Sequence, residues 1–165
     1  MKPMRFALFA FALSVFVSPG LAPAQEPVPL RAPTLVADPK EAQAELDKLQ
    51  GAWDCKSWVF DGKRSPNNGR DFESIYEGNL LTLKNKGKEY RHGLVTLNPA
   101  QTPKAVNTWD LDGPFADRTN RGIYEFDGDK LKVCFALDAG ADRPTDFESQ
   151  PGSRRLSIIY ERRKP

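Results

Sequence analysis

The side chains that could carry out acid–base or metal chemistry in this sequence are few and lie far apart. His92 is the only histidine, so a Ser-His-Asp triad would have to include it. In the alternating stretch around it, His92 falls on the face opposite Val95 and Leu97, which favours a solvent-facing histidine over a catalytic base. A zinc site needs three or four closely spaced ligands, and one histidine with two distant cysteines does not supply them. We therefore expect no catalytic residue, no metal ligand and no cofactor.

Asp110 and Asp112, followed by Gly113, have the spacing of the first ligands in a calcium-binding loop. The segment lacks the third acidic residue and the terminal glutamate that complete an EF-hand. Because Asp-Gly is equally typical of an ordinary turn, we interpret the segment as a turn.

Cys55 and Cys134 form an even pair, which favours a disulfide in an oxidising compartment. The alternation of side chains along their strands argues against one. Cys55 shares the presumed inner face of its strand with Trp53 and Val59, whereas Cys134 falls with Lys132 on the outer face of another strand. The two strands should not be neighbours, and a disulfide bridges Cα atoms no more than about 7 Å apart. We therefore predict two free, buried thiols.

The first 24 residues have the organisation of a secretory signal peptide. Lys2 and Arg5 give a positive start, an uncharged apolar stretch covers 6–17, and Ala22-Pro23-Ala24 offers small residues for cleavage. The apolar stretch is shorter than the roughly 20 residues that a membrane-spanning helix needs. We predict that residues 1–24 are removed and that the mature chain is exported to the periplasm or the extracellular space.

The predicted cleavage changes the charge balance of the chain. It removes two of the 24 basic side chains and none of the 22 acidic ones, so the charges of the mature chain cancel. Because nucleic-acid binding depends on an excess of positive charge that neutralises phosphates, we expect no nucleic-acid partner. We also expect no membrane association after cleavage. The basic residues near the C-terminus are interpreted as the solvated face and end of a last strand.

The mature chain is expected to begin with a proline-rich linker, residues 25–38, and one short helix. Asp38 can cap a helix that runs from Pro39 to Gln50, because proline suits a first helical turn. The apolar residues that share one face of this helix are Ala42, Leu46 and Leu49.

From residue 51 onward apolar residues recur at every second position, which is typical of strands with one buried face. Tight turns join most of these segments, so neighbours along the chain should pair in antiparallel fashion. A sheet of this length with one apolar face can bury that face, and leave no strand edge unpaired, by closing into a barrel. We therefore predict an all-β fold: a single domain, 39–165, that forms an up-and-down antiparallel barrel of about eight strands behind one short helix. The expected strands are 52–60, 72–77, 80–84, 88–97, 105–111, 121–126, 130–137 and 155–163.

Several segments of the sequence resemble an uncharacterised family of small exported domains that is abundant in planctomycetes. The resemblance runs through nearly the whole predicted domain in the family's order, and it implies a lipocalin-like barrel with no established activity. The sequence departs from the family at Asn107, where aspartate is more common, so the resemblance implies no role for an acid there. The matching segments are KLQGAW (48–53), PKAV (103–106), GIYEFDGDKLKVCFA (122–136), DRPTDF (142–147) and IIYERR (158–163).

The segment Gly51-Ala52-Trp53 after the helix also resembles the Gly-x-Trp start of lipocalin-type barrels. In those folds the tryptophan plugs one end of the barrel, and an arginine near the end of the chain packs over its ring. Arg162 is the matching candidate in this sequence. Since a partly desolvated cation over an indole contributes about 1–2 kcal/mol, we assign Trp53 and Arg162 a structural role.

Two functions of different kinds fit a small exported barrel. In the first, the barrel is a binding module for a small apolar ligand or a partner peptide. The long loop 138–153 then surrounds its mouth, and Arg143 and Phe147 contact the ligand. In the second, the interior is solid and the domain acts structurally or through its outer surface. A hydrolase built on carboxylates alone is a third alternative, but we expect a non-enzymatic domain.

The presence or absence of a cavity inside the barrel distinguishes the first two functions. A packed interior is the more ordinary outcome for a small barrel, whereas an apolar cavity of at least about 300 Å³ favours ligand binding. The aromatic residues that could line or fill the interior are Trp53, Trp58, Tyr76, Trp109, Tyr124, Phe126, Phe135, Phe147 and Tyr160.

Overall fold

The computed structural model describes residues 37–164 of the chain. The expected signal peptide, 1–24, and all but the last two residues of the expected linker, 25–38, lie outside the described residues. The described part is the predicted barrel domain together with the two residues that precede its helix.

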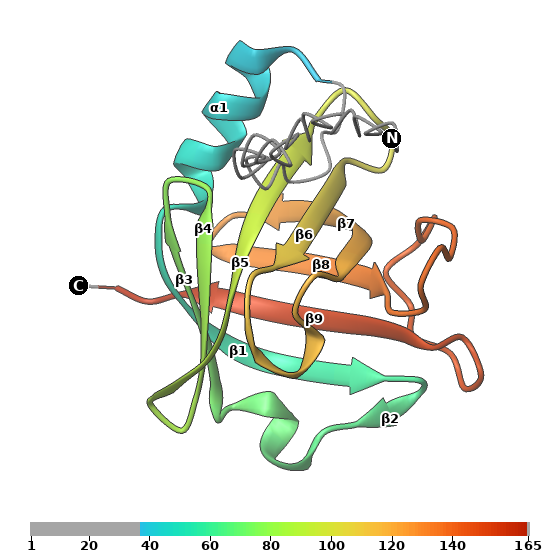
Figure 1. Cartoon of the computed structure of the whole chain (residues 1–165). Helices are drawn as coiled ribbons and strands as arrows, with labels where there is room; N and C mark the ends of the chain where they lie inside the picture. The colour runs from blue at the N-terminus through green and yellow to red at the C-terminus, as the bar shows by residue number, and fades with distance from the viewer. Residues whose placement is uncertain (1–36, 165) are drawn as a thin grey trace, which may run out of the picture. The chain divides into compact units, whose positions relative to one another are not determined.

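The domain begins with one helix, α1 (Pro39–Leu49), shown in Figure 1. Its start follows from two hydrogen bonds, because the Asp38 carboxylate accepts the amide N–H of Lys40 at 2.8 Å and that of Glu41 at 3.1 Å. Leu49 and Glu45 are buried against the barrel, so the buried face contains a carboxylate that the apolar pattern did not indicate. No helix within residues 37–164 is long and apolar enough to cross a membrane.

The rest of the described chain consists of strands joined by turns and two short 3₁₀ helices. All eight expected strands are present, and their ends lie within two residues of the predicted ones. Only the two-residue strand β2 was not predicted. The elements are β1 (Gly51–Phe60), β2 (Lys63–Arg64), η1 (Pro66–Gly69), β3 (Phe72–Glu77), β4 (Leu80–Asn85), β5 (Lys88–Asn98), β6 (Ala105–Asp110), η2 (Gly113–Phe115), β7 (Thr119–Asp127), β8 (Lys130–Ala136) and β9 (Arg155–Arg162).

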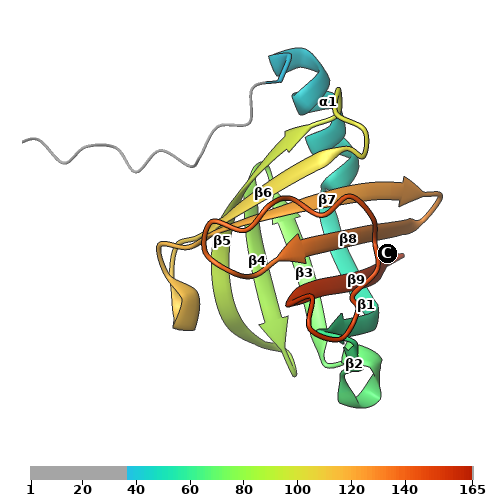
Figure 2. The same cartoon turned by 90° about the vertical axis from the view of Figure 1, so that its right-hand side faces the viewer.

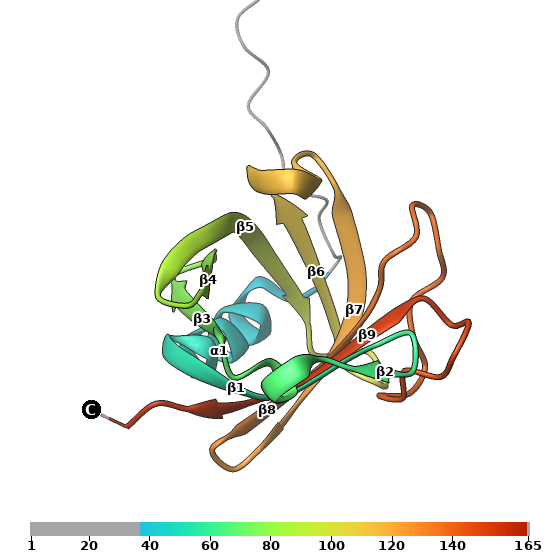
Figure 3. The same cartoon turned by 90° about the horizontal axis from the view of Figure 1, so that it is seen from below.

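Eight of these strands close into an antiparallel barrel, as predicted. β1 pairs with β3, each later strand pairs with the next, and β9 closes the ring by pairing with β1. Seen from below, the strands follow one another around a ring (Figure 3). This is the expected up-and-down, lipocalin-like architecture, with β2 as a short addition to the end of β1.

The first strand does not keep the same alternation along its whole length. Its pairing with β9 shifts register between Cys55 and Ser57, which marks a β-bulge. Trp53 and Cys55 belong to the core before the bulge, and Trp58 faces the interior after it. The prediction that Val59 shares the inner face with Trp53 is therefore wrong, because the extra residue reverses the alternation.

Large side chains fill the end of the barrel that lies next to α1. Trp53 is fully buried, and its indole Nε1 donates to the backbone carbonyl of Leu49 at 2.7 Å. The Trp53 ring packs against Phe126 with centroids 6.2 Å apart, and Phe126 packs edge-on against Tyr124 at 5.8 Å. This end of the barrel is a solid core.

Glu45 enters the same end from α1 and has three partners. Its Oε1 accepts from Lys48 at 2.8 Å and from Lys104 at 3.1 Å, and its Oε2 accepts the Tyr124 hydroxyl at 3.1 Å. Burial raises the pKa of Glu45, but these hydrogen bonds and the Lys104 charge outweigh it, so the pKa lies below its ordinary value. The carboxylate thus ties the helix to β7 and to the connection between β5 and β6.

Arg162 lies over Trp53 at the seam where the barrel closes. The two residues are paired in register, and the guanidinium carbon is 4.2 Å from the centroid of the indole ring. The same guanidinium donates to the carbonyl of Gln50 at 2.7 Å and to that of Lys48. These carbonyls stand at the end of α1, where the helix dipole favours a cation. Arg162 therefore joins the last strand, the first strand and the helix.

A double-mutant cycle should show strong coupling between Trp53 and Arg162. Trp53→Ala removes a fully buried ring and is expected to lower the free energy of unfolding by about 3–5 kcal/mol. Arg162→Ala should cost less, and the double variant less than the sum, because either substitution already breaks the shared contact. Chemical denaturation of the four proteins measures this. Additive losses, with Arg162→Ala below about 0.5 kcal/mol, would show that Arg162 is only a solvated charge.

Glu45→Gln should destabilise the domain in a pH-dependent way. Because folding lowers the pKa of Glu45, its ionised form stabilises the fold above the ordinary pKa, and this contribution is lost as the pH falls through the lower, folded-state pKa. We expect a loss of about 1–3 kcal/mol at neutral pH that shrinks in acid. Asp47→Asn, at an exposed position of α1, is the matched control and should change little. A loss that is independent of pH would contradict the assignment.

Candidate ligand-binding site

The end of the barrel away from α1 contains a cavity of about 340 Å³. All eight barrel strands contribute side chains to it, and so do the β6–β7 and β8–β9 connections. The volume lies at the lower end of the range of about 300–1,000 Å³ that is typical of small-molecule sites. The expectation of a packed interior is therefore wrong for this half of the barrel.

One wall of the cavity is apolar and comes from β9, β1 and β3. The rings of Trp58 and Phe72 stack with centroids 4.5 Å apart, and Leu156 and Ile158 continue the surface. These side chains offer an apolar ligand contact area without polar groups to desolvate.

Hydroxyl groups contribute to the deep end of the cavity. Tyr76, Tyr160 and Ser74 line it and are buried. Burial raises the pKa of both tyrosines well above the ordinary value, so the phenols stay protonated at neutral pH. The deep end is polar but uncharged.

Three aromatic side chains at the mouth remain partly exposed. Phe60, Tyr90 and Phe115 have exposed fractions of 39%, 41% and 40%, and each also lines the cavity. Single exposed apolar side chains are ordinary on a protein surface, whereas these three gather around one opening. The opening and the wall inside the cavity are thus both lined by apolar side chains.

The wall opposite the apolar one, formed by β5, β6 and β7, is polar. Arg91 Nη1 donates to Asp110 Oδ2 at 3.1 Å, and Asn120 Nδ2 donates to the same oxygen at 3.1 Å and to Thr108 Oγ1 at 3.3 Å. Burial raises the pKa of Asp110, while the Arg91 charge, the bond from Asn120 and the Arg118 charge oppose this. Asp110 is fully buried behind the cavity surface, so its role is to fix Arg91 and Asn120, which line it.

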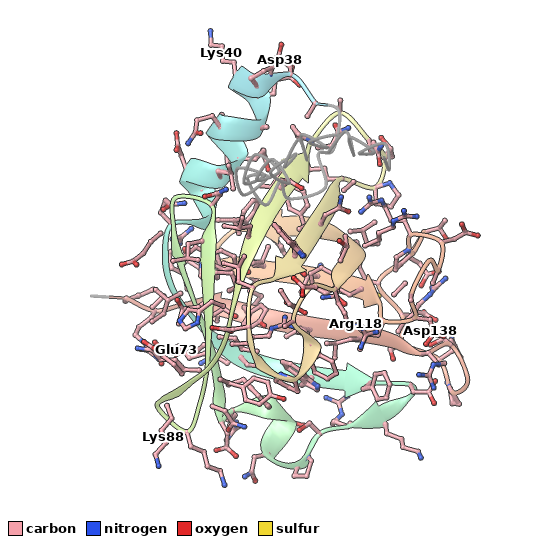
Figure 4. All side chains as sticks on the ribbon, in the orientation of Figure 1. Asp38, Lys40, Glu73, Lys88, Arg118 and Asp138 are labelled. Atoms are coloured by element: carbon pink, nitrogen blue, oxygen red, sulfur yellow. The ribbon has the colours of Figure 1, made fainter. Side chains whose placement is uncertain are left out.

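Two further arginines lie at the mouth. Arg118 Nη2 donates to the carbonyl of Leu137 at 2.5 Å, and its guanidinium carbon is 5.3 Å from the centroid of the Phe115 ring. Arg154 Nε pairs with Asp138 Oδ1 at 2.5 Å in an exposed position. Figure 4 labels Arg118 and Asp138 on this side of the barrel. Within residues 37–164, Arg118 forms no ion pair, whereas Arg91 and Arg154 each have a carboxylate partner.

His92 lies outside the cavity, as its place in the alternation suggests. Its Nδ1 is 2.6 Å from Asp112 Oδ2, and its Nε2 is 3.6 Å from Glu89. The hydrogen bond to Asp112 raises the pKa of His92, and both carboxylates add to this. The contact joins β5 to the connection that carries η2 and Phe115, so His92 helps to position one aromatic side chain of the mouth.

The residues at calcium-loop spacing do not converge in the structure. Asp110 is buried next to Arg91, whereas Asp112 is exposed next to His92. In the described part of the chain, no group of three or more His, Cys, Asp or Glu side chains is arranged to hold a metal ion.

The long connection between β8 and β9 folds back over the outer wall of the barrel (Figure 2). Arg143 fastens it there, because Nη1 donates to the carbonyls of Val106, at 2.7 Å, and of Gly122, and Nη2 donates to Asn107 Oδ1 at 2.9 Å. These bonds end on the backbone of β6 and β7 and on one side chain of β6. In this position the Arg143 guanidinium holds the β8–β9 connection against the barrel wall.

Phe147 lies in the same connection, and its carbonyl accepts the Ser157 hydroxyl at 2.7 Å. Neither Phe147 nor Arg143 is among the residues that line the cavity. Only the ends of the connection, at Leu137 and Arg154, reach the mouth. The structure thus places the two predicted ligand-binding residues on the outer wall, away from the cavity.

Both cysteines are free and buried, as predicted. Cys55 belongs to the inner core, whereas the Cys134 thiol faces the carbonyl of Glu148 in the β8–β9 connection at 3.9 Å. Strand β9 separates their strands, and two inter-strand spacings amount to about 9–10 Å, beyond the reach of a disulfide. Burial raises the pKa of each thiol to about 11.

The aromatic residues expected in the interior divide between the two ends of the barrel. Four of them line the cavity, and three fill the closed end, while Trp109 and Phe147 do neither. The cavity contains Trp58, Tyr76, Phe135 and Tyr160, and the closed end contains Trp53, Tyr124 and Phe126.

Sequence reasoning missed the charged side of the cavity. Arg91 has the same parity as Val95 and Leu97 in β5, so an inward-facing arginine could have been inferred from the alternation. Arg118 and Phe115 lie in a connection without periodicity, which offers no comparable signal.

No protein-family model matches this chain, and no curated protein matches it. The resemblance to the exported lipocalin-like family therefore stays a prediction.

Alkylation of the two cysteines should test how the β8–β9 connection is held. A pKa of about 11 leaves few thiolates near neutral pH, so both thiols should react slowly in the native protein and rapidly when it is denatured. Arg143→Met should speed the labelling of Cys134, which the connection covers, and leave that of Cys55 unchanged. Arg70→Met, at an exposed position, is the control. Equal acceleration of both thiols, or a crosslinked peptide in a non-reducing map, would contradict this arrangement.

Proposed function

We propose that this domain is an exported, non-enzymatic binding module that holds a small, mainly apolar ligand inside its barrel. The observation that carries the proposal is the cavity of about 340 Å³, which exceeds the roughly 300 Å³ that separates a ligand site from a packed core. The cavity has a solid floor because Trp53 and its neighbours fill the other end.

The distribution of side chains supports entry of a ligand from the mouth. Partly exposed aromatic rings surround the opening, and an apolar wall continues from them into the barrel. An interaction domain that used only its outer surface would gain nothing from leaving this space unfilled, since closely packed interiors are more stable. Binding of a ligand or of a peptide side chain is the use that fits the cavity.

The hydrolase alternative has less support. Glycosidase-type chemistry needs two carboxyl groups on either side of the bond that is cleaved. Among the described residues, the cavity lining contains no Asp, Glu or His. The one buried carboxylate nearby, Asp110, is engaged by Arg91 and Asn120.

Binding of the neutral dye N-phenyl-1-naphthylamine tests the proposal. We expect saturable, one-to-one binding with a rise in fluorescence as the dye leaves water. Ile158→Phe places a larger side chain in the cavity and should weaken binding at least about tenfold. Ile159→Phe makes the same change on the opposite face of β9 and is the matched control.

Comparing the dye affinity of the two variants shows whether the dye binds inside the cavity. If the dye does not bind, or if Ile158→Phe and Ile159→Phe have equal effects, the cavity is not a binding site. Circular dichroism confirms that each variant is folded. Val133→Phe repeats the test from the neighbouring strand if Ile158→Phe does not fold.

A further inference from the structure

We infer that the ligand of this cavity is an amphipathic anion: a small apolar body that carries one negatively charged group, which Arg118 and Arg91 bind at the mouth. The inference rests on the proposed function, since it concerns the chemistry of the ligand that the cavity holds.

The two walls of the cavity differ in kind. The wall from β9, β1 and β3 presents Trp58, Phe72 and Ile158, whereas the facing wall from β5 to β7 presents Arg91 and Asn120. A wholly apolar ligand would cover the polar wall without offering it a hydrogen bond, which is costly for buried donors. A ligand with one polar end matches both walls.

The charges that face the cavity are all positive. Arg91, Arg118 and Arg154 line it, and among the described residues no acidic side chain does. Asp110 neutralises Arg91 from behind the wall, and Asp138 pairs with the exposed Arg154. Arg118 forms no ion pair in the described chain, although its positive charge is among those that oppose the rise in the pKa of Asp110.

Arg118 is placed to receive an anion. One of its N–H groups is used by the Leu137 carbonyl and its plane packs near the Phe115 ring, so the side chain is held at the mouth while most of its donors stay available. Guanidinium donors form their strongest hydrogen bonds with anionic oxygens. Arg91 lies on the same side of the cavity and is fixed by Asp110.

The exposed acidic residues near the mouth do not cancel the preference of the cavity for an anion. Asp112 is paired with His92 on the outer side of β5, and the Asp61 carboxylate accepts the backbone N–H of Arg154 in an exposed position. Exposed carboxylates in water are screened, whereas a group that enters the cavity is partly desolvated and senses the arginines more strongly.

The cavity volume limits the size of the ligand. About 340 Å³ lies near the bottom of the small-molecule range, so the site suits a single short chain or a small ring system. A lipid with two long chains exceeds this space.

A series of ligands with the same chain and different charge tests the inference. Decanoate, decan-1-ol and decylamine are anionic, neutral and cationic at neutral pH, and each competes with bound N-phenyl-1-naphthylamine. We expect decanoate to bind at least about tenfold more tightly than decan-1-ol, because charge-assisted hydrogen bonds exceed neutral ones. Decylamine should bind most weakly, and added salt should reduce the advantage of decanoate.

Substitutions assign the preference to Arg118. Arg118→Gln should reduce the ratio of decanoate to decan-1-ol affinity at least about fivefold and leave decan-1-ol binding unchanged. Arg118→Lys keeps the charge and should retain part of the ratio. Arg121→Gln removes a charge from the exposed outer face of β7 nearby and is the matched control. Unchanged dye binding shows that each variant is folded.

The outcomes separate the two proposals. If the dye binds and the three competitors displace it equally well, or if Arg121→Gln lowers the ratio as much as Arg118→Gln, the anion inference is overturned while ligand binding stands. If the dye does not bind at all, the proposed function itself fails.

Discussion

The contact between Trp53 and Arg162 is the constraint on which the rest of the domain depends. It joins the first barrel strand to the last, and the same guanidinium binds the carbonyls of Lys48 and Gln50 at the end of α1. A barrel avoids free strand edges only if its first and last strands pair. One half-buried cation over one buried indole therefore fixes both the closure of the sheet and the position of the helix. The end of the barrel next to α1 is consequently solid.

Closing one end of the barrel determines where space can remain at the other. Trp53 and its aromatic neighbours take up the interior next to α1, and the bulge after Cys55 then turns Trp58 inward. Without the bulge, Ser57 and Val59 would occupy the inner face, and the apolar wall would lose its stacked Trp58–Phe72 pair. A single inserted residue thus defines one side of the cavity.

The barrel was predictable from the sequence because each strand has one buried face, so its apolar residues alternate. The cavity was less predictable, because it depends on departures from that regularity. A period of two cannot locate the bulge near Cys55, and it says nothing about Phe115 and Arg118, which lie in an irregular connection. The expectation that loop 138–153 surrounds the mouth rests on its length and on the general rule that loops on a rigid scaffold carry binding sites. The hydrogen bonds of Arg143 to carbonyls of β6 and β7 fold it over the outer wall instead, and these long-range contacts have no local sequence signature.

The polar wall of the cavity is difficult to explain by stability. A buried ion pair such as Arg91–Asp110 contributes little to folding relative to well-packed apolar residues, because both charges lose hydration. Within the described chain, Asp110 Oδ1 and Arg91 Nε also have no hydrogen-bond partner, which adds to the cost. The closed end shows that this sequence can fill its interior with aromatic rings. Apolar packing therefore stabilises the barrel at its closed end. The fixed charges lie at the mouth, where a charged ligand would contact them.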